Sequence, residues 1–115
     1  MPKLLSKKAA EEGTYIITAE FIDDDGDSVA PDTLTWTLTD SSGTVINSRT
    51  SVSVSSPTAS EDIVLSGDDL ALQSGESGDT MRILTIQATY DSDAGTDLPL
   101  NDAAYFYIKD LKTIT

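Results

Sequence analysis

The feature that most constrains the fold is a segment in which threonine alternates with large apolar residues. Residues 33–39 read Thr-Leu-Thr-Trp-Thr-Leu-Thr. In an extended chain, Leu34, Trp36 and Leu38 therefore lie on one side and the threonines on the other. This is the pattern of a β-strand with one buried and one solvated face. It favours Trp36 as a core residue over Trp36 as a platform for stacking a sugar.

Other segments with the same alternation predict a domain built from strands. The expected strands are residues 14–22, 61–65, 81–90 and 101–110, of which 81–90 is the longest. Residues 44–49 are expected to form a hairpin with 33–39. We expect residues 51–60 to form an edge strand or a crossing connection, and residues 66–72 to form one helical turn. Turn residues recur between these segments, and no long helical periodicity interrupts them. We therefore expect an all-β fold, an antiparallel sandwich of about 6–7 strands with one short helical turn.

The charged residues divide the chain into an acidic body and basic ends. The sequence has 20 Asp and Glu against 7 Lys and Arg, a formal net charge of -13. Between residues 9 and 108 the only bases are Arg49 and Arg82, and this stretch holds every acid except Asp110. An acidic body keeps a small domain soluble. The second interpretation is that the basic N-terminal segment docks on an acidic partner.

The composition excludes several kinds of chemistry. The chain of 115 residues contains no His and no Cys. Imidazole acid–base catalysis, Ser-His-Asp and Cys-His triads, thiolate or imidazole zinc sites and disulfides are therefore impossible. The shortage of clustered cations argues against a nucleic-acid partner. We expect neither an enzyme nor a cofactor, and no catalytic residue is assigned.

An acidic loop offers the densest set of oxygen ligands in the sequence. Asp23, Asp25 and Asp27 are weak candidates for a Ca²⁺ site, but their spacing is not that of an EF-hand loop. A solvated turn is the simpler interpretation, so no metal is expected. The residues 91–97 form a second acidic turn, which can join the first only if both lie at the same end of the fold.

Two tyrosines on the last expected strand share a face. Tyr105 and Tyr107 alternate with Ala104, Phe106 and Ile108. They either cover the core or form an interface patch, and the sequence leaves both interpretations open.

The pattern of residues 13–17, 21–26, 31–40 and 43–46 resembles the front half of immunoglobulin-like (Ig-like) and fibronectin-III-like domains. The resemblance covers about residues 13–110 and implies an Ig-like β-sandwich. On this resemblance, residues 14–22, 33–39, 44–49, 81–90 and 101–110 correspond to strands B, C, C′, F and G. The chain lacks the Cys pair and an early Tyr in residues 81–90, which favours a bacterial or viral variant. More narrowly, it is similar to the small acidic Ig-like structural proteins of tailed bacteriophages.

This resemblance implies a virion structural protein, most specifically a capsid decoration or cement protein on the outer capsid surface. The expected partner is the major capsid protein or another virion protein, homo-oligomerisation is left open, and no membrane partner is expected. The protein would be made in the host cytoplasm and reside in the virion. The alternative is an Ig-like adhesion or carbohydrate-binding module of a phage tail or bacterial cell surface.

The expected partner-binding residues lie at the N-terminus and on the last strand. We divide the chain into residues 1–12, an N-terminal arm or first strand, residues 13–110, the sandwich, and residues 111–115, a tail. The partner-binding candidates are Lys3, Leu4, Leu5, Lys7, Lys8, Tyr105 and Tyr107. Since the core alternation begins only at Tyr15, removal of residues 1–12 is expected to leave a folded domain.

Overall fold

The computed structural model describes residues 3–5 and 7–111, and their regular structure is almost entirely β-strand. The strands are β1 (Lys3–Leu4), β2 (Ala9–Ala10), β3 (Thr14–Glu20), β4 (Thr33–Asp40), β5 (Val52–Ser53), β6 (Ser60–Ser66), β7 (Thr80–Ser92) and β8 (Gly95–Lys109). A single 3₁₀ turn, η1 (Gly67–Leu70), is the helical element of these residues and lies where a helical turn was expected. The all-β prediction is confirmed. Among the described residues, no helix has the length and apolar character needed to span a membrane.

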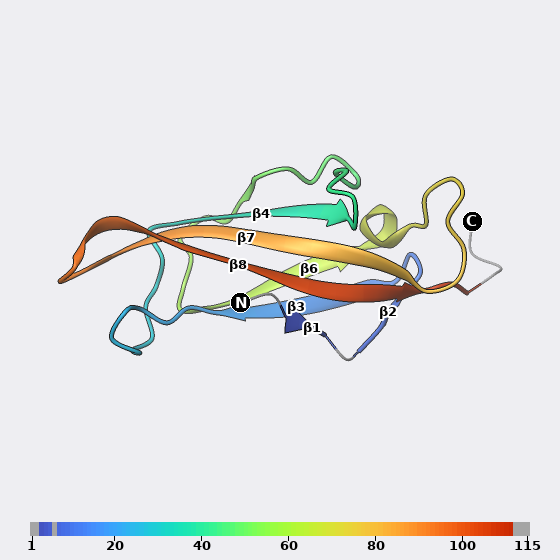
Figure 1. Cartoon of the computed structure of the whole chain (residues 1–115). Coiled ribbons are helices and arrows are strands. Elements are labelled where there is room, and N and C mark those ends of the chain that lie inside the picture. The colour runs from blue at the N-terminus through green and yellow to red at the C-terminus, as the bar shows by residue number, and fades with distance from the viewer. Residues whose placement is uncertain (1–2, 6, 112–115) are drawn as a thin grey trace.

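The larger of two sheets is built around a long hairpin. Its strand order is β1-β8-β7-β4-β5, and β2 pairs with β8 further along the chain from β1. The β7–β8 ladder runs from Thr80 opposite Ile108 to Ser92 opposite Gly95, with an irregularity between Tyr90 and Ser92. Figure 1 shows this hairpin extending past the other strands at one end of the molecule. It gives the domain a long axis of 52 Å against 25 and 23 Å.

The smaller sheet pairs β3 with β6 and packs on the inner face of the larger one. Their antiparallel register runs from Thr14 opposite Ser66 to Glu20 opposite Ser60. Inward residues of both sheets form a continuous core, in which the rings of Tyr15 and Phe106 lie 4.8 Å apart between centroids. Trp36 is 7% exposed and belongs to this core, so the core assignment from the Thr-Leu-Thr-Trp pattern is confirmed.

The strand expected at residues 44–49 does not form. Its only ladder contact is an isolated bridge from Val45 to Thr39. Asn47 and Ser48 have φ of 54° and 56°, a left-handed conformation that a strand cannot continue through. Ile46 is instead 2% exposed and joins the core. The strand that pairs with β4 on this side is β5, which is two residues long.

The expected antiparallel arrangement is found only in part, because β1 and β2 run parallel to β8 whereas the other strand pairs are antiparallel. The larger sheet is therefore mixed. The longest strand is β8 with 15 residues, not the strand over residues 81–90. It begins at Gly95 rather than at residue 101, since the acidic residues 91–97 belong mostly to the ends of the hairpin.

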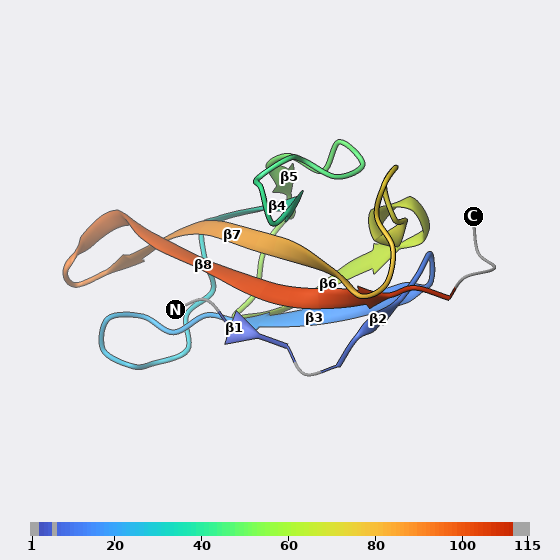
Figure 2. The same ribbon diagram turned by 45° about the vertical axis from the view of Figure 1, so that its right-hand side comes forward.

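The N-terminal residues contribute to the core earlier than the alternation suggests. Ala9 is 1% exposed and Glu11 is 4% exposed. The Glu11 Oε1 atom accepts a hydrogen bond from the Leu111 amide, and the Tyr15 hydroxyl donates to the Lys7 carbonyl. The core therefore begins before Tyr15. Figure 2 shows β1 and β2 following one edge of β8.

Candidate functional site

Strands β4, β7 and β8 are neighbours in the larger sheet and present one face away from the smaller sheet. In β4 and β7 alternate residues are buried, and in β8 this alternation holds over residues 105–108. The residues between the inward positions face outward. The outward positions are Thr33, Thr35, Thr37, Thr39, Met81, Ile83, Thr85, Gln87, Thr89, Pro99, Asn101, Ala103, Tyr105 and Tyr107. We call this set the outer face. It has no counterpart layer among the described residues.

The apolar part of the outer face lies toward one end of the sheet. Tyr105 is opposite Ile83 in the ladder, and Tyr107 is opposite Met81. Directly opposed side chains in an antiparallel pair lie close enough to pack on each other. All four are half-buried although no other strand covers them. The tyrosines thus form a patch with Met81 and Ile83 on the outside of the sheet, while Phe106 and Ile108 cover the core.

The outer face carries no charged residue. The charged residues of the same three stretches, Asp40, Arg82 and Asp102, occupy alternate positions that point to the other side. Charges return only toward the ends of the strands, at Asp91, Asp97 and Lys109. In a chain with formal charge -13 this is a defined electroneutral surface. Depletion of charge together with partly exposed Tyr and Met is the composition of protein-interface cores.

The other expected partner-binding residues lie along the edge of β8. Lys3 and Leu4 form β1, and the Leu5 amide donates to the Tyr105 carbonyl at 2.7 Å. Leu5 is half-buried and packs against the domain's own core. Lys7 and Lys8 are exposed, and the Lys8 ammonium pairs with Asp79 at 2.5 Å. The structure thus places the N-terminal segment beside β8, the strand that carries the two tyrosines. The charge of Lys8 is paired with Asp79 within the domain.

The two acidic loops lie at the same end of the molecule. The Tyr90 hydroxyl donates to Asp24 at 3.3 Å, which joins the first loop to the hairpin. In the first loop, Asp23 Oδ1 accepts the amides of Asp25 and Asp27, both at 2.9 Å. The carboxylates of Asp23, Asp24 and Asp25 come within 4.8 Å of one another, whereas Asp27 is not part of that group. The loop has the hydrogen bonds of a self-contained Asp turn.

A second group of carboxylates joins Asp91 and Asp97 of the second acidic turn to Asp32, which the sequence analysis did not single out. Asp32, Asp91 and Asp97 bring their oxygens within 4.8 Å of one another, and all three side chains are exposed. Local desolvation, a hydrogen bond with Asp91 and repulsion from Asp91 and Asp97 raise the pKa of Asp32. Such clusters are common on acidic surfaces without an ion. Their direct consequence is mutual repulsion at neutral pH.

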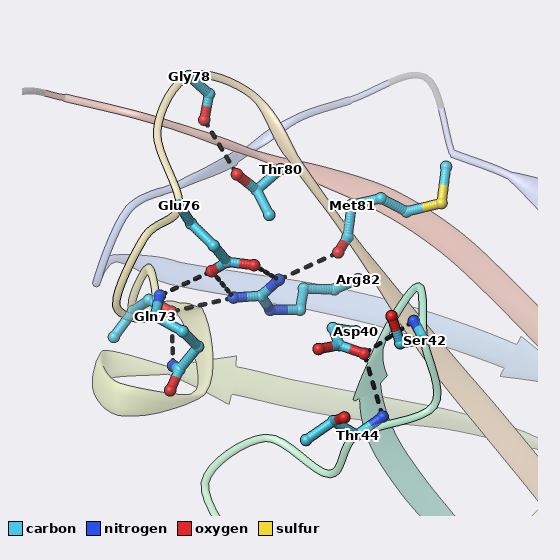
Figure 3. A network of polar contacts seen from close by, with 10 residues as sticks. Asp40, Ser42, Thr44, Gln73, Glu76, Gly78, Thr80, Met81 and Arg82 are labelled. Atoms are coloured by element: carbon cyan, nitrogen blue, oxygen red, sulfur yellow. Dashed lines mark hydrogen bonds and ion pairs between the residues drawn. The ribbon is translucent and has the colours of Figure 1, made fainter.

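A buried arginine lies at the opposite end of the larger sheet (Figure 3). Arg82 is fully buried and its guanidinium donates to Glu76 through Nη1 at 2.9 Å and Nη2 at 2.6 Å. It also donates to the carbonyls of Met81 and Ala71. The hydrogen bond from Arg82 lowers the pKa of Glu76. This network holds the 73–79 loop against the sheet, so the role of Arg82 is structural.

Asp69 is a further buried charge, besides Arg82 and Glu11, and it organises the turn after β6. It is 1% exposed and accepts hydrogen bonds from Arg49 Nε at 2.7 Å and Asn47 Nδ2 at 2.8 Å. Burial alone would raise the pKa of Asp69, but the hydrogen bonds from Arg49, Asn47 and the Ser66 amide outweigh it and lower the pKa. The Asp69 carboxylate and the two Nη atoms of Arg82 thus have partners inside the domain. Among the described residues, the buried Nε atom of Arg82 has no hydrogen-bond partner.

Sequence reasoning missed the outer face as a unit. It singled out Tyr105 and Tyr107 but not Met81 and Ile83, because their proximity depends on the register between β7 and β8. It also missed Arg82, although this residue continues the inward series Leu84, Ile86 and Ala88. The sequence signal for Arg82 is a charged residue at an inward position of a strongly alternating strand, because a charge at such a position needs a partner inside the fold.

No family model, curated protein or solved structure matches this chain.

Proposed function

We propose that this chain is a non-enzymatic structural protein of a virion, which docks through its outer face on the capsid surface of a tailed bacteriophage. The partner in this proposal is the major capsid protein or another virion protein. The mechanism is physical: each copy buries part of its surface on the shell and adds contact free energy. Because the shell repeats the same site, modest contacts are multiplied over many copies.

The strand order supports the Ig-like part of the proposal. Strands B and E of such domains lie in one sheet, and strands C, F and G in the other. Here β3 and β6 form one sheet, and β4, β7 and β8 are neighbours in the other. In this proposal the position of C′, which the resemblance assigned to residues 44–49, is taken by β5, which pairs with β4.

The observation that carries the docking proposal is the electroneutral outer face on a strongly acidic body. An acidic body is repelled by other acidic surfaces and by its own copies. The outer face is the part of the described sheet surface where contact can occur without placing carboxylates against the partner. Its Tyr105–Ile83 and Tyr107–Met81 pairs supply the apolar and aromatic contact area that interfaces use as anchors.

Copy number in purified particles tests the virion part of the proposal. Quantitative mass spectrometry of virions should find this chain in proportion to the capsid subunits. A copy number proportional to the single tail would instead favour the adhesion module, and absence from the particles would refute a virion role.

A binding assay tests the docking surface. Recombinant protein is sedimented with particles that lack it, and the double variant Tyr105→Ser/Tyr107→Ser is compared with Val64→Ser. Val64 is 52% exposed on the outside of the smaller sheet, so its variant is a matched apolar-to-polar control. The tyrosine variant should lose attachment and the control should keep it. Attachment should also persist in 1 M NaCl, where the Debye length is about 3 Å and exposed ion pairs are screened. Equal attachment by both variants would refute docking through the outer face.

A further inference from the structure

Strand β5 forms a free lateral edge of the larger sheet. It is the last strand in the order β1-β8-β7-β4-β5, and among the described residues no strand pairs with its other side. Figure 1 shows the green chain segment that follows β4 running along the margin of the molecule. The backbone groups of such an edge can pair with a further strand.

The peptide groups around Val54 alternate in direction along this edge. The Val54 amide donates to the Leu34 carbonyl of β4 at 3.0 Å. Because a trans peptide directs the carbonyl of one residue and the amide of the next to opposite sides, the Ser53 carbonyl points away from β4. Continuation of the alternation directs the amides of Ser53 and Ser55 the same way. Within the described part of the chain, these outward groups make no hydrogen bond.

The β5 edge lacks the charged side chains that normally keep sheet edges apart. Residues 50–60 form the longest uncharged run of the sequence, in a chain with 20 Asp and Glu. The side chains of Ser53 and Ser55 are exposed, whereas the strands of the smaller sheet expose Glu20 and Asp62. An acidic chain repels its own copies wherever carboxylates meet. Two copies can therefore approach each other along β5 without placing carboxylates at the contact.

Only one symmetric antiparallel register between two β5 edges uses groups that are all available. A register centred on Ser53 needs Ser51, but Ser51 has φ of 47° and its amide already donates to a threonine hydroxyl of β4. A register centred on Ser55 needs Pro57, which has no amide hydrogen. The register centred on Val54 pairs Ser53 of each copy with Ser55 of the other. Each of these two pairs exchanges both of its backbone hydrogen bonds.

We propose that β5 is a self-association site, at which a second copy of this chain pairs antiparallel in the register centred on Val54. The contact is isologous, so it closes at a dimer instead of growing into a filament. The two Val54 side chains lie opposite each other on the inner side of the joined sheet, where each already packs against its own core. The ladder is short, and the dimer is therefore weak and dependent on protein concentration.

The pairing also joins the outer faces of the two copies into one surface. Thr35, an outer-face residue, lies opposite Ser53 in the β4–β5 ladder, so the outer face continues to the β5 edge. Two linked outer faces bind a repeating shell more tightly than one, because the second contact forms at a high effective concentration. This consequence rests on the proposed function, whereas the pairing itself does not.

A chain without cysteine allows a direct test of the register. Val54→Cys places the only thiol of each copy at the symmetry axis, where the Cα atoms of a non-hydrogen-bonded pair lie about 4.5 Å apart, within the range of a disulfide. The control Ser77→Cys places a thiol on the exposed 73–79 loop. In oxidised glutathione, Val54→Cys should form covalent dimers much faster than Ser77→Cys. Equal rates for the two variants would overturn the proposal.

Analytical ultracentrifugation of the full chain over a range of concentrations measures the dimer itself. Ser53→Pro removes one outward amide hydrogen per copy, and thus two hydrogen bonds per dimer, whereas Ser53→Ala keeps it. The dissociation constant should rise about tenfold or more for Ser53→Pro and stay near wild type for Ser53→Ala. Dimerisation should strengthen between about 0.01 M and 1 M NaCl, because the Debye length falls from about 30 Å to 3 Å and the acidic bodies repel each other less.

Circular dichroism verifies that each variant is folded, and the two cysteine variants test the same contact if Ser53→Pro does not fold. A wild-type chain that stays monomeric at high concentration and high salt would overturn the proposal. A dimer equally stable in Ser53→Pro and Ser53→Ala would do the same.

The outer face provides the last control. The double variant Tyr105→Ser/Tyr107→Ser should dimerise like wild type, and loss of its dimer would overturn pairing through β5 in favour of contact through the tyrosines. Failure of the wild-type chain to attach to particles would refute the docking function alone, because the dimer is measured in solution. Attachment by a chain that never dimerises would refute only the β5 proposal.

Discussion

Arg82 and Glu76 form a two-pronged ion pair that fastens the 73–79 loop to the end of the larger sheet, with N–O distances of 2.9 and 2.6 Å. The arginine is fully buried, and the glutamate side chain is 22% exposed. Two parallel N–H···O bonds to a carboxylate give this pair fixed geometry as well as charge. Removing one partner therefore leaves a charge with no route to water.

Replacement of Glu76 by Ala should destabilise the domain by about 3 kcal/mol, near the lower end of the cost of breaking a buried pair, because the glutamate is partly solvated. The matched control is Asp79→Ala in the same loop, which breaks the exposed Lys8–Asp79 pair and should cost about 0–1 kcal/mol. Urea unfolding at pH 7 measures both. Equal costs would show that Arg82 finds another partner.

The same pair predicts an acid-sensitive part of the stability. The pKa of Glu76 is lowered from 4.5 in the folded state, mainly by the hydrogen bond from Arg82. Because the folded pKa is below the unfolded one, the stabilisation is complete above pH 4.5 and is lost as the pH falls through the lower folded value. Unfolding free energies of wild type and Glu76→Gln should therefore converge toward low pH. A difference that does not change with pH would contradict the linkage.

Asp32→Asn should stabilise the domain at neutral pH. The pKa of Asp32 is raised, chiefly by desolvation and by Asp91, so its folded state binds a proton more tightly than its unfolded state. Its contribution is therefore favourable at low pH and diminishes as the pH rises through the raised value. In thermal unfolding, the melting temperature of the variant should be higher than that of wild type at pH 7. The difference should be smaller at pH 3. A variant less stable than wild type at pH 7 would refute the repulsive cluster.

Trp36→Ala should destabilise the domain by about 3–5 kcal/mol, the usual cost of emptying a large aromatic core site. The indole is buried and also has the Arg49 guanidinium carbon 6.0 Å from its ring centroid. Thr35→Ala, on the solvated side of the same strand, is the control. Denaturant unfolding followed by circular dichroism measures both, and a small loss for Trp36→Ala would place the indole outside the packed core.

Deletion of residues 1–12 should destabilise the domain strongly, contrary to the expectation from the alternation alone. The deletion removes Ala9 and Glu11 from buried positions and leaves the Leu111 amide without its hydrogen-bond acceptor. Deletion of residues 1–8 spares both side chains and should cost less. Melting temperatures of the two truncated chains measure the difference, and equal values would show that β2 contributes little.

The strands that sequence reasoning predicted well are those whose own alternation specifies a buried face. The Leu34–Trp36–Leu38 series and the Leu84–Ile86–Ala88 series needed no knowledge of neighbours, and both are buried. The predictions fail where the structure of a segment depends on its pairing with residues far away in the sequence. Two-residue strands such as β1 and β2 have no periodicity to detect, and their parallel direction depends on β8. Residues 44–49 have strand-forming composition, but the left-handed Asn47 and Ser48 turn the chain and bury Ile46 instead.

The candidate surface was predictable only in part for the same reason. Tyr105 and Tyr107 share a face by their spacing alone, whereas Met81 and Ile83 join them only through the β7–β8 register. Among the described strands, β3 pairs only with β6, and no property of residues 14–20 taken alone indicates this.

The parallel pairing of β1 with β8 has a mechanical consequence. These strands stand at opposite ends of the chain and run side by side in the same direction. Tension applied at the two termini therefore slides one strand along the other and loads their hydrogen bonds together in shear, instead of opening them one after another. Pulling between Lys3 and Lys109 should meet greater resistance than pulling apart the two strands of the β7–β8 hairpin from their open end, which single-molecule force measurements can compare.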